Sequence, residues 1–302
     1  PYSDVRVDAS MSLRDFSFWG FGLGVVQGKV AYEDLVLNFP AVTGQKGRTQ
    51  YFGKAALTFG PSMHARAEVN VPQGRTEDLL DIIAGLHPNI AVMQGTIAGL
   101  ASGRVEIDSP VERFEGLAAF DFRDTTYYGR RMGDGSSRLR FVDGKEMVLE
   151  RTTLEGPLGT SWVEGTFTFA GGLDYRFGGE ELSLAEVVGP GVAARMGMQG
   201  TLWLQGSVSG NSTLPVVDAT LTSPRVTFAD RDLGALHLVG KMVGRELEIS
   251  GKPFRDANGF VEMKVREPFP FDMSVELTLP EIRPLLPQNS LTQGMSGSLS
   301  GT

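Results

Sequence analysis

The sequence predicts a mostly β protein in which one elongated antiparallel sheet is folded lengthwise into a trough, with a short helix once per repeat. Three observations lead to this prediction. Apolar and polar residues alternate along most of the chain, which is the pattern of strands with one buried face. Glycine accounts for 39 of 302 residues and falls between these alternating runs, as it does in hairpins. A tetrapeptide also recurs roughly every 100 residues, which indicates a stacked repeat.

The alternating runs are the predicted strands. Residues 118–123, 162–169 and 273–277 each place apolar side chains on one face and polar side chains on the other. Short connections such as Gly133-Asp134-Gly135 and Asp143-Gly144 separate neighbouring runs. Because glycine and aspartate favour tight turns, we expect most neighbouring strands to pair as antiparallel hairpins.

Helical periodicity is scarce. Residues 76–85 form the clearest predicted helix, with Thr76 as N-cap, acidic residues in the first turn and Gly85 as C-cap. Residues 182–188 and 281–286 are its predicted counterparts. One short helix therefore precedes each copy of the repeated tetrapeptide.

The repeated tetrapeptide divides the chain. Met93-Gln94-Gly95-Thr96 returns as Met198-Gln199-Gly200-Thr201 and, in degraded form, as Thr292-Gln293-Gly294-Met295. No stretch rich in proline, serine or charge separates the copies, so we expect one continuous body with about eight strands in each repeat. The predicted segment covers residues 1–302, with repeat-like units at 1–92, 93–197 and 198–292 and the start of a further unit at 293–302.

A large sheet with one apolar face must cover that face, and three short helices are too few to do so. Two arrangements remain: an open trough with an apolar lining, which we favour, and a closed sandwich in which the same side chains fill a core. The predicted lining consists of the apolar members of the alternating runs: Leu37, Phe39, Leu57, Phe59, Ala118, Phe120, Phe122, Leu139, Phe141, Val163, Phe167, Phe169, Leu202, Leu204, Ala219, Leu221, Val226, Phe228, Leu247, Ile249, Met263, Val265, Met273, Val275 and Leu277.

Composition argues against several classes of function. The net charge is −8 and no basic cluster exceeds Gly129-Arg130-Arg131, so nucleic acid is not an expected partner. There is no cysteine, and His64, His87 and His237 lie on separate elements without acidic residues at metal-site spacing. We therefore expect no catalytic residue, no metal and no cofactor, and a protein that is not an enzyme.

Neither end of the sequence reads as a natural boundary. Strand-like alternation is already present at residues 5–11 and is still present at 295–302. No window reaches the eighteen consecutive apolar residues of a membrane span, and residues 1–4 lack the features of a signal peptide. We expect a fragment of a longer protein whose targeting segment lies outside it.

The run Gly200-Thr201-Leu202-Trp203-Leu204-Gln205-Gly206, continued through Asn211 and Pro215 into the strand at 216–221, resembles the repeat of TamB and AsmA-like envelope proteins. The segment 279–287, just upstream of another Gln-Gly pair, is similar to the short helix that enters the next repeat of that family. The resemblance covers residues 173–302 well and 63–172 fairly, whereas residues 1–62 match only in strand character.

This resemblance implies a periplasmic β-groove, or β-taco, in a Gram-negative envelope, with an inner-membrane anchor and an outer-membrane barrel partner outside the fragment. It implies that the groove carries phospholipid between the two membranes by holding its acyl chains, and we expect the chain to act as a monomer. The alternative function is a translocation and assembly scaffold that assists outer-membrane protein insertion or protein secretion by strand augmentation.

Overall fold

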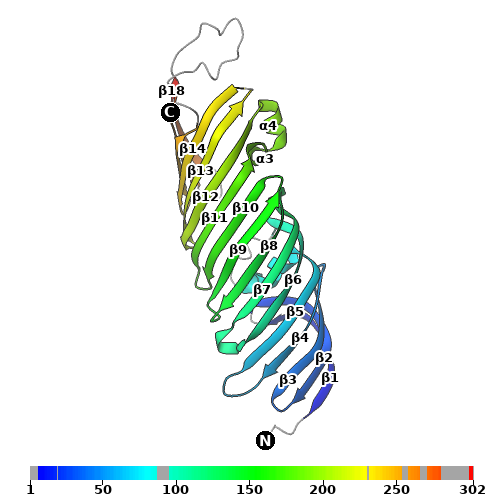
Figure 1. Ribbon diagram of the computed structural model, residues 1–302. Helices are drawn as coiled ribbons and strands as arrows, with labels where there is room; N and C mark the ends of the chain where they lie inside the picture. The colour runs from blue at the N-terminus through cyan, green and yellow to red at the C-terminus, as the bar shows by residue number, and fades with distance from the viewer. Residues whose placement is uncertain are drawn as a thin grey trace. The chain divides into compact units, whose positions relative to one another are not determined.

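The computed structural model describes residues 6–18, 20–86, 95–229, 231–253, 258–265, 271–279 and 299–301, and the statements below concern these residues. The chain divides into two compact units: unit 1 is Pro1–Gly156 with Val163–Gly172, and unit 2 is Pro157–Trp162 with Leu173–Thr302. Strands dominate both units and the helices are few and short (Figure 1). The predicted fold class, a mostly β protein built on an open antiparallel sheet, is confirmed.

Unit 1 is a meander of long strands interrupted by one helix. Each strand from β1 to β9 pairs antiparallel with the next one along the chain. The elements are β1 (Val7–Phe18), β2 (Phe21–Glu33), β3 (Val36–Lys46), β4 (Thr49–Thr58), β5 (His64–Arg75), α1 (Thr76–Ile83), the 3-10 turn η1 (Ala84–Leu86), β6 (Ile97–Pro110), the 3-10 turn η2 (Val111–Arg113), β7 (Gly116–Tyr127), β8 (Arg130–Val142) and β9 (Glu146–Gly156).

Unit 2 contains β11 (Gly172–Ser183) from Leu173 onward, two consecutive short helices, α3 (Leu184–Val188) and α4 (Pro190–Met196), and a second antiparallel meander. Strand β10 (Gly159–Thr168) contributes residues to both units, with the boundary at Val163. The second meander consists of β12 (Gln199–Asn211), β13 (Leu214–Phe228), β14 (Arg231–Val243), β15 (Glu246–Lys252), β16 (Asn258–Val265), β17 (Phe271–Leu279) and β18 (Leu299–Gly301).

The strands are longer than the alternating runs suggested. Between α1 and α3 the chain forms six strands, β6 to β11, where the sequence predicted about eight per repeat. The predicted turn Gly133-Asp134-Gly135 is wrong, because it lies inside β8. Gly133 has a φ of 112°, and a Cβ there would lie 1.9 Å from the Glu155 carbonyl oxygen, so this glycine permits a close approach of β9. The predicted turn at Asp143-Gly144 is confirmed between β8 and β9.

Two of the three predicted helices lie in the described part of the chain. The first begins at Thr76, but Arg75 rather than Thr76 occupies the N-cap position, and Ala84 rather than Gly85 the C-cap. The second is confirmed as α3, with the Ser183 hydroxyl accepting a hydrogen bond from the Glu186 N–H at 3.4 Å. Helix α4 was not predicted, since Gly189 and Pro190 suggested a break; the proline instead occupies the first turn of the new helix. The third predicted helix, at 281–286, lies outside the described residues.

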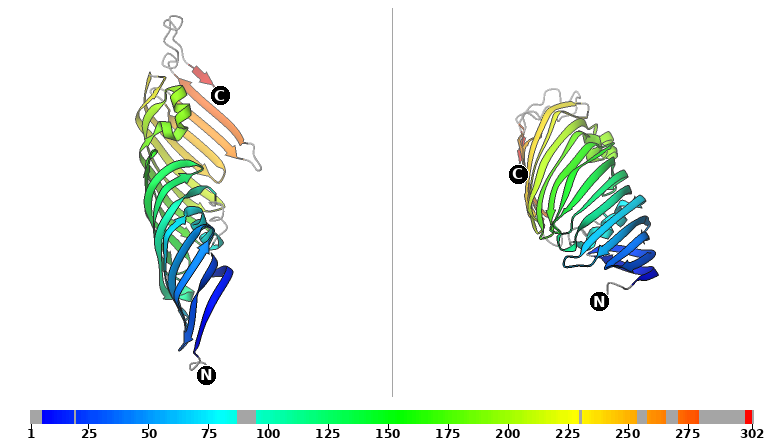
Figure 2. Two further views of the ribbon diagram at one scale, coloured as in Figure 1. Left: turned by 90° about the vertical axis from the view of Figure 1, so that its right-hand side faces the viewer. Right: turned by 60° about the horizontal axis from the view of Figure 1, so that its bottom comes forward.

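The sheet of unit 1 is strongly curled. Every ladder from β1–β2 to β8–β9 contains a register shift, and such bulges bend strands and increase their twist. Phe21 at the start of β2 contacts Phe141 on β8, with ring centroids 5.9 Å apart, although β3 to β7 separate these strands in the sheet. A flat sheet could not bring the two rings together. The left view of Figure 2 shows the curvature of β1 to β9, coloured blue to green.

Candidate functional site

The curled sheet of unit 1 encloses an apolar cavity of about 410 Å³, which we call the groove. Strands from β1 to β9 and helix α1 all contribute to its wall. Its volume lies within the range of small-molecule sites, and apolar hollows of this kind mark ligand-binding grooves in many proteins. The wall contains no acidic residue among the described part of the chain.

Seven predicted lining residues border the groove: Phe39, Leu57, Ala118, Phe120, Phe122, Leu139 and Phe141. The alternation of the strands explains this placement, because each of the seven lies on the inward face of a strand of unit 1. Most of the remaining wall is formed by apolar residues that the sequence analysis did not select: Met11, Leu13, Phe16, Phe18, Phe21, Leu23, Val26, Val42, Ala55, Ala56, Ala65, Ala67, Val69, Val71, Leu79, Leu80, Ile82, Ile83, Val105, Ile107, Phe114 and Met147. Tyr51, Gly53, Lys54, Arg66 and Thr76 complete it.

Other predicted lining residues of unit 1 do not border the groove. Leu37 is half-buried on β3, and Phe59 is 38 % exposed with its ring against Tyr32 at a centroid distance of 6.5 Å. Phe167 is buried and packs edge-on against Phe169, while Val163 is half-buried on the same strand as Phe167. Their assignment to a lipid path stays a prediction.

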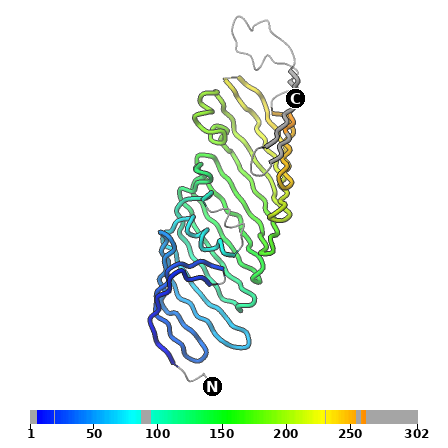
Figure 3. The backbone as a smooth tube through the Cα atoms, turned by 180° about the vertical axis from the view of Figure 1, so that it is seen from behind, coloured from blue at the N-terminus to red at the C-terminus, as the bar shows by residue number. Residues whose placement is uncertain are grey.

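Both strands of the β1–β2 hairpin contribute side chains to the groove wall. Figure 3 shows this hairpin, in dark blue, crossing the strands of its own unit. At the start of β2, Phe21 packs against Phe114 and Phe141 at centroid distances of 6.0 and 5.9 Å, and the latter two rings are 5.6 Å apart. This aromatic cluster had no sequence signal, because its three members are distant in the chain.

Hydrogen bonds and an ion pair attach helix α1 to the end of β3 and to the β3–β4 turn. The Asp78 carboxylate accepts hydrogen bonds from the Arg48 N–H at 2.9 Å and the Thr49 hydroxyl at 2.8 Å. Thr49 in turn accepts one from the Arg75 N–H at 2.8 Å, and Lys46 pairs with Asp81 at 2.5 Å. Asp78 and Asp81 are therefore held by the β3–β4 turn and the end of β3, while Leu79, Leu80, Ile82 and Ile83 line the groove.

Tyr51 is a buried polar side chain in the groove wall. Its hydroxyl donates to the Leu23 carbonyl at 2.7 Å, and its ring occupies the space where a Cβ on Gly44 would lie. Burial raises the pKa of Tyr51 to about 12. The phenol therefore stays neutral at ordinary pH, and its hydroxyl is already paired.

The outer face of unit 1 carries the charge that the inner face lacks. Glu68 pairs with Lys54 at 3.1 Å and with Arg104 at 3.0 Å. Lys54 also borders the groove, but its ammonium group lies in this exposed ion pair. The hydrogen bond from Lys54 holds the pKa of Glu68 below its ordinary value, against a smaller opposing effect of desolvation.

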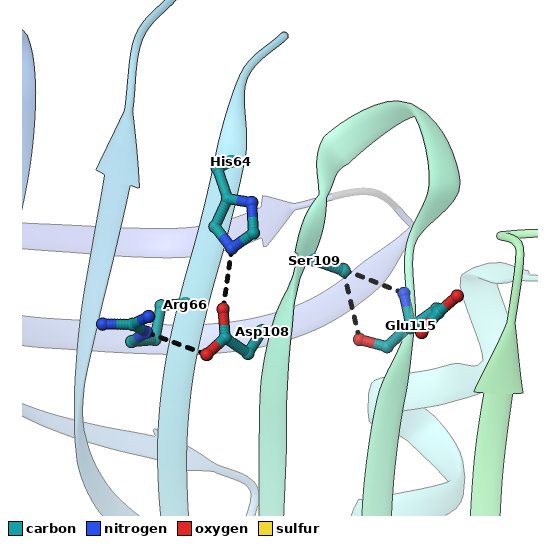
Figure 4. A network of polar contacts seen from close by, with 5 residues as sticks. All are labelled: His64, Arg66, Asp108, Ser109 and Glu115. Atoms are coloured by element: carbon teal, nitrogen blue, oxygen red, sulfur yellow. Dashed lines mark hydrogen bonds and ion pairs between the residues drawn. The ribbon is translucent and has the colours of Figure 1, made fainter.

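A second outer-face network joins β5 to β6 (Figure 4). Asp108 contacts the His64 ring at 2.7 Å and accepts a hydrogen bond from the Arg66 side chain at 3.1 Å. These two hydrogen bonds, the one from His64 first, hold the pKa of Asp108 below its ordinary value. Beside them the Ser109 hydroxyl accepts from the Glu115 N–H at 2.9 Å, which orders the β6–β7 connection. We interpret the network as structural, since it lies on the exposed side of the sheet.

Unit 2 contains a buried apolar core among its described residues. Leu202, only 1 % exposed, and Val226 join Leu182, Leu184 and Leu233 in a buried core. The predicted lining residues Leu204, Leu221 and Phe228 pack against this core, and Ala219, Leu247 and Ile249 are half-buried on their strands. The side chains of Met263, Val265, Met273, Val275 and Leu277 lie outside the described residues.

The described residues contain no group of three His, Asp or Glu side chains arranged to hold a metal ion. His64 and His237 are on different strands, and His87 lies outside the described part. Within the described segments, no helix has the length and apolar character needed to cross a membrane. Compared with known proteins, the chain matches no family model, no curated protein and no solved structure.

Proposed function

We propose that this chain is a segment of a lipid-transfer conduit that holds phospholipid acyl chains in an apolar groove. The single observation that supports this proposal most strongly is the unfilled apolar groove of unit 1. Protein interiors normally close to crystal-like packing density, so a hollow of this size with an apolar wall is a site for an apolar ligand.

The energetics favour an acyl chain as that ligand. Exposing an acyl chain to water costs about 0.8 kcal/mol per CH₂ group, or roughly 12 kcal/mol for a chain of sixteen carbons. An apolar wall removes most of this penalty without any chemical step. The proposal therefore requires no catalytic residue, metal or cofactor.

The charge distribution supports the same function. A buried charge along the wall would interrupt the path of an acyl chain, because an unpaired charge in an apolar environment is strongly unfavourable. In unit 1, Lys54, Arg66, Glu68, Arg104 and Asp108 all place their charges in outer-face ion pairs. The inner face remains apolar as a result.

The compartment and partners follow from the resemblance of residues 173–302 to the TamB and AsmA-like repeat. As part of the same proposal, the chain acts as a monomer in the periplasm of a Gram-negative envelope. The longer protein would be anchored in the inner membrane and would meet an outer-membrane partner. Phospholipid would be passed between the two membranes.

Site-specific photo-crosslinking tests the proposal. Phe120 borders the groove, and the next residue, Asp121, is exposed on the opposite side of β7. A photoreactive residue at position 120 should capture phospholipid from vesicles of phosphatidylethanolamine and phosphatidylglycerol, detected by mass spectrometry. The same residue at position 121 is the matched control and should capture far less. Equal labelling at the two positions would contradict the conduit and would leave the strand-augmentation scaffold as the better candidate.

A further inference from the structure

The wall of the groove contains one buried hydroxyl without a hydrogen-bond partner. Thr76, the first residue of α1, is 6 % exposed and borders the groove. Its Oγ1 is one of two buried side-chain polar atoms in the described residues that lack a partner, the other being Thr125 Oγ1, which does not border the groove. Buried hydroxyls are nearly always paired in native proteins, so this hydroxyl lacks a partner that the described residues do not supply.

The neighbouring polar groups do not supply the missing partner. Thr49 donates its one hydroxyl hydrogen to Asp78 and accepts from the Arg75 N–H, so it has no hydrogen left to donate to Thr76. Asp78 faces the β3–β4 turn, and Asp81 pairs with Lys46. No side-chain oxygen caps α1 among the described residues. Thr76 is therefore the available hydrogen-bond donor on this part of the wall.

The surroundings select the kind of acceptor. Glu77, Asp78 and Asp81 place three carboxylates on the same short helix, and their field disfavours a second anion close by. A neutral carbonyl oxygen carries no such penalty, and the partial positive charge of a helix N-terminus favours it. Thr76 Oγ1 is covered in the structure, but threonine in a helix has two accessible χ1 rotamers, and rotation between them redirects the hydroxyl.

We propose that Thr76 is the polar anchor of the groove and donates a hydrogen bond to the ester carbonyl oxygen at the head of a bound acyl chain. This inference rests on the proposed function and extends it, because it names the ligand as an ester-linked acyl chain and places its carbonyl at α1. Leu79 and Ile83 on the same helix, with Val71 beside it on β5, then contact the first methylene groups.

Two ligands that differ only at the carbonyl test the inference. Lysophosphatidylcholine with an ester-linked sixteen-carbon chain and its ether-linked analogue are titrated calorimetrically into the chain, both below their micelle concentrations. The native chain should bind the ester about fivefold more tightly, which is the effect of one neutral hydrogen bond. Thr76→Val, which keeps the shape but removes the hydroxyl, should bind both ligands equally, and Thr76→Ser should keep the preference.

The outcomes separate the two proposals. Equal binding of ester and ether by the native chain would overturn the role of Thr76 while leaving the groove as a lipid site. A preference that persists in Thr76→Val would also overturn it, because the donor would then lie elsewhere. Tighter binding of free palmitate than of the ester would contradict the neutral carbonyl. If the native chain binds neither lysolipid, the proposed function itself fails. The comparison of ligands on the native chain does not depend on any variant folding.

Discussion

Units 1 and 2 contain the same succession of elements, a long strand followed by short helical structure and another long strand, but they use it differently. In unit 1, α1 connects β5 to β6 and its apolar side chains line a hollow. In unit 2, α3 and α4 connect β11 to β12, and Leu184 and Ala193 of these helices are buried. The helical segments therefore pack differently: in unit 1, α1 borders a hollow beside the small buried cluster of Val26, Tyr51 and Val71, whereas in unit 2 Leu184 of α3 belongs to the buried core.

Strand register explains part of this difference. All the ladders of unit 1 from β1–β2 to β8–β9 contain a register shift. In unit 2, β12–β13 and β13–β14 also contain shifts, whereas β14–β15, β15–β16 and β16–β17 do not. Bulges bend a sheet, so repeated bulges curl unit 1 until Phe21 reaches Phe141. The curl creates a concave face that the side chains of α1 only partly fill.

The largest expected effect is a difference in lost stability between a substitution in the core of unit 2 and a matched substitution in the groove wall. Leu202→Ala should destabilise the protein by about 3 kcal/mol, because it opens a new cavity in the core of unit 2. Leu139→Ala is the matched change in the groove wall and should cost only about 1 kcal/mol, since Leu139 already borders a hollow. Urea unfolding followed by circular dichroism measures both. Equal losses would show that the groove is packed as tightly as the core.

The reverse substitution tests the same contrast. Ala193→Phe in unit 2 should cost about 2 kcal/mol, because Ala193 is 3 % exposed and a larger side chain would strain its buried surroundings. Ala67→Phe in unit 1 should leave the unfolding midpoint nearly unchanged, since Ala67 borders open space beside Ala55 and Ile107. It should, however, reduce lysolipid affinity about tenfold by filling the groove. Unchanged affinity in Ala67→Phe would argue that ligands bind elsewhere.

A smaller effect compares one buried tyrosine from each unit. Burial raises the pKa of Tyr51 in unit 1 and of Tyr175 in unit 2 from 10.0 to about 12. Above pH 10 the unfolded chain therefore loses its phenol protons while the folded chain keeps them, which favours unfolding. The stability contributed by the two neutral phenols is complete below pH 10 and is lost as the pH rises toward 12. Tyr51→Phe and Tyr175→Phe should each make the unfolding midpoint less sensitive to alkaline pH.

Tyr51→Phe should differ from Tyr175→Phe at neutral pH. Tyr51→Phe removes the hydrogen bond from the phenol to the Leu23 carbonyl and should lower the free energy of unfolding by about 1 kcal/mol at neutral pH. Near-ultraviolet absorbance of tyrosinate gives an independent check, because each variant should lose one late-titrating group. A titration of the native chain complete by about pH 11 would contradict the burial of both phenols.

Much of the fold could be predicted from local pattern. Alternation identified the strands, and it placed Phe39, Leu57, Ala118 and Phe120 on the face that borders the groove. The same pattern predicted Leu202 as lining, yet this residue lies in the core of unit 2. Alternation reports which face of a strand is apolar, but whether that face meets a hollow or another side chain depends on sheet curvature.

The parts that escaped prediction depend on contacts between distant residues. Gly133 belongs to a Gly-Asp-Gly sequence that is typical of turns, but in the structure it permits a close approach to Glu155 of the neighbouring strand. Thr76 has the pattern of an N-cap, but one residue of displacement makes it the first residue of the helix and buries its hydroxyl without a partner. The contact of Phe21 with Phe114 and Phe141 results from the curl. Single-residue shifts and long-range curvature leave no periodic signal.

The smallest expected effect compares the two faces of one sheet. Asp108 lies on the outer face, where His64 and Arg66 lower its pKa below the ordinary 3.8. The depressed pKa gives a stability contribution that is present above pH 3.8 and is lost as the pH falls through the folded-state pKa. Because this network is exposed and screened by salt, Asp108→Asn should shift the unfolding midpoint only slightly at about pH 5, and the shift should shrink as the pH falls through the folded-state pKa.

Lipid capture by a photoreactive residue at position 120 should be the same in the Asp108→Asn background as in the native one, because the altered group faces away from the groove. Ala67→Phe, on the inner face of the same strand that carries Arg66, should abolish most of that capture. Comparing Asp108→Asn with Ala67→Phe therefore tests whether the ligand binds only at the inner face of the sheet. Loss of capture in Asp108→Asn with an unchanged unfolding midpoint would mean that the outer face takes part, and the division into an apolar inner face and a structural outer face would be wrong.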